Sequence, residues 1–179
     1  MTIEFEDILN VPDDLVERVR NWRNSNHVNQ YMITNHYITK AEHSRWIKKL
    51  KTRDATKAWI IRYNKKPVGL VSLSNIDYSK KTTEWGFYIA EESVRRRGIG
   101  SAVLYWLIEY VFDTLNFQTM STMVLENNPV ALQMYEKFGF KKENATPQTL
   151  ERNGKTITVF IMSLQKEEWN NIKEKRGKN

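Results

Sequence analysis

The segment that most constrains the fold runs from residue 82 to about residue 115. A β-prone run at 82–90 leads into the arginine- and glycine-rich turn RRRGIG at 95–100, and an apolar stretch follows. Because Glu109 and Asp113 are the only charged residues from 100 to 115, that stretch predicts a helix buried against a sheet. A glycine turn between a strand and such a helix directs free backbone amides and the positive end of the helix dipole at one point. The segment therefore allows a small-phosphate site, although by itself it fits an ordinary glycine turn with solvated arginines better.

Turn and cap signals divide the whole chain into short elements in the order β-α-α-β-β-β-α-β-α-β-β. Strand-like runs at 58–63 and 68–76 around a proline turn predict a hairpin. Within the run 82–90, alternation places Glu84, Gly86 and Tyr88 on one face. The boundary signals are a capping box at Thr39–Glu42, an Asn128-Pro129 start, a Gly139 stop and an Asn-Gly hairpin turn at 153–154.

The composition limits the class of protein. With 179 residues, 40% of them hydrophobic, the chain predicts one domain over residues 1–168, followed by a basic tail at 169–179 that we expect to be solvated. The absence of cysteine excludes disulfides and a cysteine acyl-enzyme. No apolar run has the length of a membrane span and the first ten residues are acidic, so we expect a cytoplasmic protein without a membrane partner.

The net charge of +7 permits nucleic-acid binding but does not favour it. The 28 basic residues are partly offset by 21 acidic ones and are spread along the chain, so no nucleic-acid partner is expected. The alternative outside enzymology is an RNA-associated module that keeps coenzyme A only as a ligand.

Two motifs resemble the acetyl-coenzyme A motifs of the GNAT N-acetyltransferase superfamily. RRRGIG matches R/Q-x-x-G-x-G/A, and NPVALQMYEKFGF at 128–140 fills N-x-x-A-x-x-x-Y-E-K-x-G-F completely. The resemblance covers roughly Ala58–Leu164. It implies an α/β (α+β) GNAT fold, with a mixed, mainly antiparallel central sheet of about seven strands, splayed at the coenzyme site and flanked by about four helices.

The resemblance also implies the residues that bind acetyl-coenzyme A. The turn would wrap the pyrophosphate with backbone amides, a strand would pair through its backbone with the pantetheine arm, and the second motif would flank the thiol end. In that order the implied residues are Arg95, Arg96, Arg97, Gly98, Ile99, Gly100 and Ser101, then Phe87, Tyr88 and Ile89, then Asn128, Ala131, Tyr135 and Lys137.

Acetyl transfer to an amine needs a base for the amine and an acid for the departing thiolate. Within the resemblance, Tyr135 is the expected acid, although its helical spacing also suits a buried core aromatic. Glu126 and Glu84 are the candidate bases, with Glu126 preferred because it ends a strand where we expect two strands to part. Direct transfer is expected because no cysteine can carry the acetyl group. The three histidines have no metal-like spacing, so no metal is expected.

The acceptor is expected over the first two helices and the segment 29–38 between them, which we call the flap. Candidate contacts there are Trp22, Arg23, Tyr31, His36 and Tyr37, each of which also suits a core or surface role. Residues 29–40 contain no acid, which favours an anionic small-molecule amine over a polyamine or a protein N-terminus. A homodimer remains open.

The stretch Trp22–Asn24 and the second motif also resemble particular branches of the superfamily. One branch acetylates the 4-amine of a UDP-linked deoxy-amino-sugar on the way to pseudaminic acid. The ribosomal-protein alanine acetyltransferases are a second branch that the chain resembles, so the sequence leaves a sugar nucleotide, a ribosomal N-terminus and a small amine as alternative acceptors.

Overall fold

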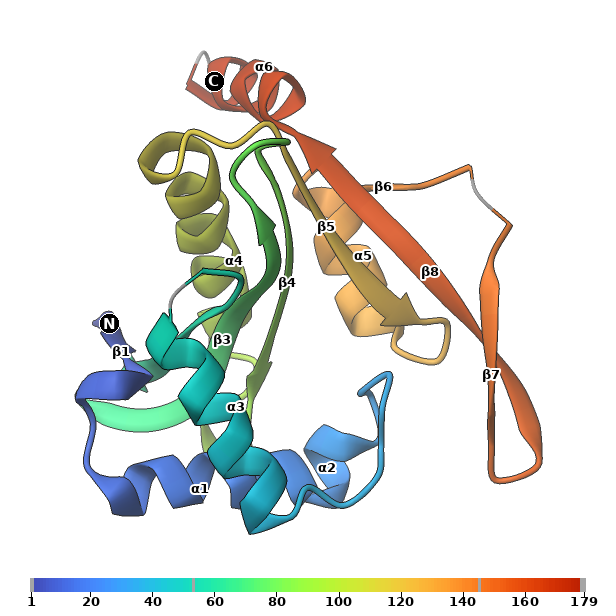
Figure 1. Ribbon diagram of the computed structural model, residues 1–179. Coiled ribbons are helices and arrows are strands. Elements are labelled where there is room, and N and C mark those ends of the chain that lie inside the picture. The colour runs from blue at the N-terminus through green and yellow to red at the C-terminus, as the bar shows by residue number, and fades with distance from the viewer. Residues whose placement is uncertain (1, 53, 145, 178–179) are drawn as a thin grey trace.

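A computed structural model describes residues 2–52, 54–144 and 146–177, and its core is one open sheet (Figure 1). The eight strands that are described follow the order β1-β2-β3-β4-β5-β8-β6, and β7 pairs with β8. The strands are β1 Ile3–Asp7, β2 Lys57–Tyr63, β3 Lys66–Asp77, β4 Thr82–Ile89, β5 Thr119–Leu125, β6 Lys141–Lys142, β7 Gln148–Arg152 and β8 Lys155–Gln165.

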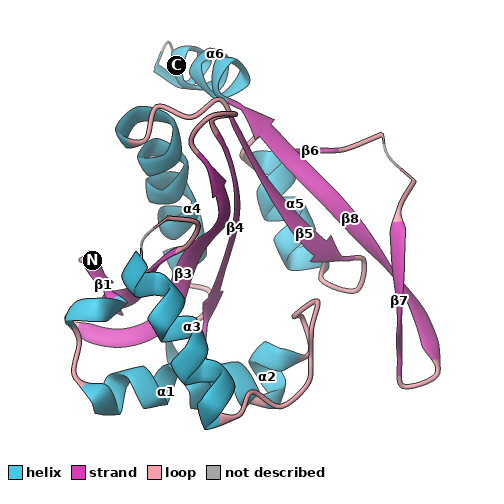
Figure 2. Cartoon of the chain, viewed as in Figure 1, coloured by secondary structure: helices cyan, strands magenta, loops and turns pink. Residues whose placement is uncertain are grey.

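Helices cover both faces of this sheet (Figure 2). They are α1 Asp13–Asn24, α2 Asn26–Asn29, α3 Lys40–Thr52, α4 Ile99–Glu109, α5 Pro129–Lys137 and α6 Lys166–Gly177. One hydrophobic cluster lies on the face covered by α4 and α5, and a second lies on the face covered by α1–α3. Alternating residues of β4 divide between them, since Trp85 and Phe87 join the first cluster and Tyr88 joins the second. The buried faces of the helices therefore hold the sheet from both sides.

All strand pairs among the described residues are antiparallel except β4–β5, which is parallel. This pair is short: its register includes Thr82↔Thr119, Thr83↔Met120 and Glu84↔Ser121 and extends no further. Beyond Glu84 the two strands diverge, as Figure 1 shows for β4 and β5. The expected GNAT architecture is confirmed, including the splay in a mainly antiparallel sheet.

The predicted boundary signals form as expected. The Thr39 amide donates to Glu42 Oε2 at 2.8 Å and the Glu42 amide donates to Thr39 Oγ1 at 3.2 Å, which is the capping box. Asn128 caps α5 ahead of a proline, and Gly139 ends it with φ of +98°. The hairpin between β2 and β3 also forms. Its turn, however, uses Asn64 and Lys65, both with positive φ, and the proline lies inside β3.

The C-terminal residues differ from the sequence prediction. Instead of a solvated tail, α6 runs from Lys166 to Gly177. Its Trp169 is fully buried, stacks on Phe138 at 6.1 Å and donates Nε1 to Glu109 Oε1 at 2.5 Å. The charged composition of the segment hid this buried anchoring residue. We propose that α6 belongs to the same domain as residues 1–168.

Candidate functional site

The centre of the site is the gap between β4 and β5. Just past the last paired residues, the Thr122 hydroxyl donates to the Trp85 carbonyl at 2.8 Å, in place of a backbone amide of β5. This side-chain bond is buried, and it satisfies the first β4 carbonyl beyond the ladder. One buried threonine, which was not predicted as a site residue, therefore marks the start of the gap.

The backbone of β4 beyond Trp85 alternates between the gap and the neighbouring strand β3. Because the Trp85 carbonyl faces β5, the main-chain groups of Phe87 and Ile89 face the same gap. The Ala90 amide donates to Val68 at 2.8 Å and so confirms that the even-numbered residues face β3. An extended ligand can add to this edge as an extra strand. Tyr88, which was predicted to contribute its backbone here, instead turns its main-chain groups toward β3.

The N-terminus of α4 has the form of an anion site. Gly98 precedes the helix with φ of +76°, Arg96 also has a positive φ, and no side chain caps the first turn. The amides of the first turn therefore remain for a ligand. The predicted arginines at 95–97 are exposed around this turn, and Arg95 is 3.4 Å from the Ile89 carbonyl. The Ile99 side chain is buried in the core, so only its backbone can meet a ligand.

The surroundings of Gly100 give independent evidence that a phosphate ligand can bind at this helix turn. A Cβ added there would lie 3.5 Å from Met134 Sδ and 3.8 Å from the Phe87 ring, which are ordinary contacts. Its φ lies outside the region that favours glycine. No contact with the described residues therefore requires glycine at this position. Close approach of a ligand to the backbone does explain it.

Tyr135 of α5 reaches the gap from the α4–α5 side. Its ring packs edge-on against Trp85 with centroids 5.0 Å apart, and burial raises the pKa of its phenol. The hydroxyl therefore stays protonated at neutral pH and can serve as a proton donor. Beside it, the buried Trp85 Nε1 has no hydrogen-bond partner among the described residues. Such an orphaned donor fits a site that a polar ligand completes.

The other predicted residues of α5 occupy three different positions. Asn128 uses its side-chain oxygen to accept the Ala131 amide at 3.3 Å, which fixes the start of the helix. Ala131 is buried beneath that start. Lys137 is exposed in the last turn, at the end of α5 opposite to Asn128.

The α1–α3 face of β4 carries a row of groups that point to the opposite side of the gap from Tyr135. Glu84 is half-buried and sits at the last paired position of the β4–β5 ladder. At Gly86 an added Cβ would meet nothing within 4 Å, so the row contains open space in the middle of a strand. A glycine in a strand interior often marks close approach of a ligand. Glu84 and Tyr88 flank this space.

The orientation of Glu126 differs from our expectation. Its Oε1 accepts the Thr158 amide at 2.7 Å, and its own amide donates to the Thr158 carbonyl at 2.9 Å. Thr158 belongs to β8, which lies on the side of β5 opposite to β4. The carboxylate of Glu126 thus extends the β5–β8 pairing and is directed away from the gap. Of the two candidate bases, Glu84 has the better position.

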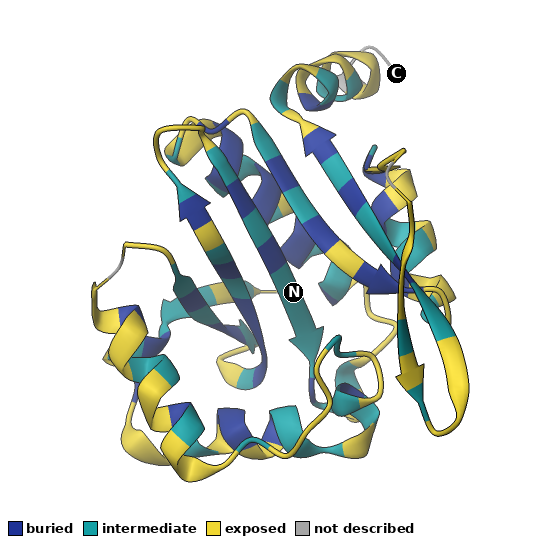
Figure 3. Ribbon diagram, turned by 45° about the vertical axis from the view of Figure 1, so that its right-hand side comes forward, coloured by how far each residue is buried: buried dark blue, intermediate teal, exposed yellow. Residues whose placement is uncertain are grey.

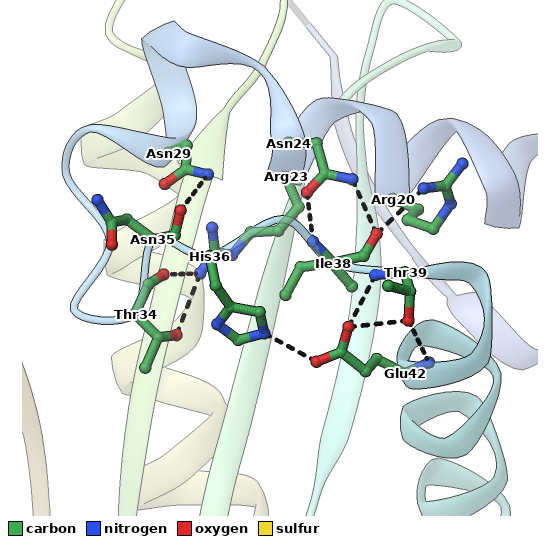
Figure 4. Close-up of polar contacts among 10 residues, drawn as sticks. All are labelled: Arg20, Arg23, Asn24, Asn29, Thr34, Asn35, His36, Ile38, Thr39 and Glu42. Carbon is green, nitrogen blue, oxygen red and sulfur yellow. Dashed lines mark hydrogen bonds and ion pairs between the residues drawn. The ribbon is translucent and has the colours of Figure 1, made fainter.

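The flap is anchored to α1 and α3 by polar contacts (Figure 4). The Asn24 side chain exchanges two hydrogen bonds with the backbone of Ile38, at 2.8 and 3.0 Å. His36 Nε2 lies 2.8 Å from Glu42 Oε1. Hydrogen bonds from Thr39 and then His36 lower the pKa of Glu42 to about 2. The flap is therefore an ordered segment in this structure.

Two arginines bind flap carbonyls from different sides. Arg23 Nη2 donates to Thr34 at 2.5 Å, and Arg152 from β7 donates to Gln30 at 2.9 Å and Met32 at 2.8 Å. The β7–β8 hairpin and the flap consequently lie side by side, as Figure 3 also shows. Arg152 was not predicted from the sequence, because nothing local marks a contact to a segment about 120 residues earlier.

The remaining acceptor candidates divide into buried and exposed residues. Trp22 is buried in the α1–α3 cluster and donates Nε1 to Glu91 at 3.1 Å, which favours the core role. Tyr31 and Tyr37 are 40% and 64% exposed. The Tyr37 hydroxyl accepts from Arg20 at 3.0 Å.

The splayed strands, the uncapped helix turn and the buried tyrosine fit the acetyl-coenzyme A-dependent N-acetyltransferases that the two sequence motifs resemble. A sequence profile of the Acetyltransferase (GNAT) family matches residues 16–140, and the chain belongs to this family. It is 28% identical over 138 residues to the acetyltransferase PseH of Campylobacter jejuni, covering 77% of this chain and 84% of that protein. It is 31% identical over 101 residues to the ribosomal-type N-acetyltransferase YdaF of Bacillus subtilis, covering 56% and 55%.

Solved structures agree with the fold. Spermidine N-acetyltransferase from Vibrio cholerae, in complex with CoA and spermine, superposes with a TM-score of 0.83 at 20% identity and covers 94% of this chain and 98% of its own. Campylobacter jejuni PseH in complex with acetyl coenzyme A superposes with a TM-score of 0.67 at 20% identity, covering 92% and 99%. Acetyl-coenzyme A is thus the acetyl donor expected for the gap, and the open β4 edge and the α4 turn fit it.

The described part of the chain offers neither a metal site nor a membrane-spanning helix. Over residues 2–52, 54–144 and 146–177, no group of three or more histidine, aspartate and glutamate side chains is placed to hold a metal ion. Among the same residues, no helix combines the length and apolarity that a membrane crossing requires.

Proposed function

We propose that this N-acetyltransferase acetylates the 4-amine of a UDP-linked amino-sugar, as a cytoplasmic step toward the pseudaminic acid of flagellin glycans. The observation that carries the proposal is the charge of the flap. Residues 29–40 contain no acid, and the guanidinium groups of Arg23 and Arg152 both bind the flap backbone. A cationic polyamine would meet positive charge here, whereas a nucleotide diphosphate would be attracted. The similarity to PseH over most of its length supports the same class of acceptor.

The proposed mechanism is direct transfer through the β4–β5 gap. The acceptor lies over Gly86 on the α1–α3 face, and its amine loses a proton to Glu84 through a bridging water. The amine nitrogen then attacks the thioester carbonyl; a nitrogen–carbon bond forms and the carbon–sulfur bond breaks. Tyr135, on the other side of the gap, donates its proton to the departing sulfur, and the excess proton of the acylated nitrogen returns through water to the Tyr135 oxygen. Phe87 and Ile89 hold the donor arm through their backbone groups.

A polyamine acceptor is the second candidate, because the spermidine N-acetyltransferase of Vibrio cholerae has a closely similar fold. At 20% identity this likeness concerns the fold alone. A ribosomal-protein N-terminus is a third alternative, given the partial match to YdaF. Both of these acceptors are cations, for which acidic grooves are better suited than this flap.

An acceptor panel tests the proposal. Release of free thiol from acetyl-coenzyme A is followed with UDP-4-amino-4,6-dideoxy-N-acetyl-altrosamine, with spermidine and with a peptide that begins with alanine. We expect kcat/KM for the sugar nucleotide to exceed the other two by about 10²-fold. A higher kcat/KM for spermidine or for the peptide would overturn the proposal in favour of that acceptor. Tight, salt-sensitive RNA binding without thiol release would favour the binding-module alternative.

A further inference from the structure

Two buried hydrogen-bond donors on the α1–α3 face have no partner among the residues that the structure describes. They are Nη1 of Arg23 and the hydroxyl of Tyr88, which we call the donor pair. Buried polar groups in native proteins are nearly always hydrogen-bonded, so each exception needs a physical explanation. Neither group has a role in the acetyl transfer proposed above. The donor pair is therefore a part of the site that the chemistry leaves unexplained.

The Nη2 group of the same guanidinium already has a partner. Its Nη2 donates to the Thr34 carbonyl at 2.5 Å, and Arg152 takes the carbonyls of Gln30 and Met32. These three flap carbonyls are thus satisfied without Nη1. Burial is the largest effect on the pKa of Arg23 and lowers it. Tyr88 raises this pKa and Arg152 lowers it, so the three side chains interact electrostatically.

The position of Tyr88 relates the donor pair to the reaction. Tyr88 follows Gly86 by two residues and Glu84 by four on the same face of β4, a span of roughly 13 Å at the rise of an extended strand. The space above Gly86 is open, since an added Cβ would meet no atom within 4 Å. A ligand over Gly86 therefore has the candidate base at one end and the donor pair at the other.

The chemistry of the donor pair selects its ligand. A guanidinium can only donate hydrogen bonds, and burial raises the pKa of the Tyr88 phenol, which keeps that hydroxyl available as a donor. An oxyanion is the natural partner of two such donors. We infer that Arg23 Nη1 and the Tyr88 hydroxyl bind the phosphate that joins the acceptor's sugar to its nucleotide. This inference rests on the proposed function and adds where the anionic part of the substrate lies.

The positions of Glu84, Gly86 and Tyr88 also determine the orientation of the acceptor. A sugar ring lies over Gly86, with its amine toward Glu84 and its anomeric phosphate toward Tyr88. Both donors are closed off from solvent in this structure. An acceptor therefore reaches them only when the groups that cover them move.

Binding of UDP to the enzyme saturated with coenzyme A is the test. Saturation fills the pyrophosphate site of the coenzyme, so that UDP reports on the acceptor side alone. Tyr88→Phe removes only the unpaired hydroxyl, and Arg23→Lys keeps a charge and a donor for Thr34 while removing Nη1. Tyr78→Phe is the matched control, because Tyr78 lies in the β3–β4 turn and is 52% exposed. Dissociation constants are measured by isothermal titration calorimetry and melting temperatures by differential scanning calorimetry.

We expect UDP to bind about tenfold more weakly to Tyr88→Phe and to Arg23→Lys than to wild type, and equally well to Tyr78→Phe. The melting temperature of free Tyr88→Phe should not fall, because the hydroxyl has no protein partner to lose. Equal UDP affinity in wild type and both variants, or no UDP binding at millimolar concentration, overturns the inference.

UDP binding and acetylation of the UDP-amino-sugar together distinguish a failure of the inference from a failure of the proposed function. If UDP binding behaves as expected but the UDP-amino-sugar is not acetylated, the oxyanion site stands and the proposed function is wrong. If the UDP-amino-sugar is acetylated and both variants retain the wild-type KM for it, the proposed function stands and the inference is wrong.

Discussion

Replacing Gly100 by alanine should separate the stability of the protein from its affinity for the coenzyme. Gly100 is the second residue of α4, its φ is acceptable for alanine, and the new Cβ makes only ordinary contacts with Met134 and Phe87. Alanine in a helix is more stable than glycine by about 0.5–1 kcal/mol. For a chain of this size that gain raises the melting temperature of the free protein by about 1–4 °C.

The same Cβ should oppose coenzyme binding, because it occupies the side of the helix turn where we expect the pyrophosphate to approach the backbone. A tenfold loss of affinity removes about 1.4 kcal/mol of ligand-induced stabilisation. At saturating coenzyme this lowers the melting temperature by roughly 3–6 °C relative to wild type. The variant should therefore melt above wild type without coenzyme A and below it, or level with it, when coenzyme A is present.

Differential scanning calorimetry with and without millimolar coenzyme A measures both effects in one experiment. Ser44→Ala, on the exposed face of α3, is the control, since it improves helix propensity far from the turn and should raise both melting temperatures equally. A full coenzyme-induced shift in Gly100→Ala would refute the close approach at this glycine. A lower melting temperature for the free variant would refute our account of the space around it.

Three further predictions follow from the site and the flap. Tyr135→Phe should lower kcat by about 10²-fold with little change in coenzyme affinity, and unaltered turnover would remove Tyr135 from the mechanism. Glu84→Gln should lower kcat/KM by about 10²-fold at pH 7 and recover at high pH, where the amine is free without a base. Glu126→Gln keeps an oxygen for the Thr158 amide, so its kcat/KM should stay near that of wild type. A larger loss of kcat/KM in Glu126→Gln than in Glu84→Gln would identify Glu126 as the base. No loss in either variant would mean that solvent deprotonates the amine. Finally, because the pKa of Glu42 is lowered from 4.5 to about 2, its carboxylate stabilises the fold above pH 4.5 and loses this effect as the pH falls toward 2. Glu42→Gln should thus melt below wild type at pH 7, with a difference that narrows between pH 4.5 and 2, and a constant difference would contradict the cap and the His36 contact as its cause.

The sequence by itself determined those features whose physical causes are local. The Thr39–Glu42 box, the Asn128 cap, the left-handed Gly139 and the Asn153–Gly154 turn each depend on residues within a few positions of one another. Such residues can satisfy orphan backbone groups or supply a positive φ without help from distant parts of the chain. The order of the main elements followed from these signals, whereas α2, β6 and α6 were not predicted. The two motifs, read by resemblance, then supplied the family and the coenzyme site.

Tertiary structure decided where a side chain had two local options and a distant partner chose between them. Glu126 could have entered the gap, but the Thr158 amide of β8 takes its carboxylate. The segment after 165 was expected to be a tail, but Trp169 finds a pocket against Phe138 and an acceptor in Glu109. Charge-rich composition cannot reveal one buried anchor, because burial depends on partners about 30 and 60 residues away.

The splay itself is the clearest case. Thr122 resembles an ordinary strand residue in the sequence, and only its bond to the Trp85 carbonyl, 37 residues away, shows that it lies where β4 and β5 part. The donor pair is similar, since Arg23 and Tyr88 come from a helix and a strand that meet only in the folded protein. Long-range pairing of this kind leaves no local periodicity to detect. The sequence therefore determined which chemistry the chain could carry, and the packing of the strands and the flap decided which residues face the acceptor.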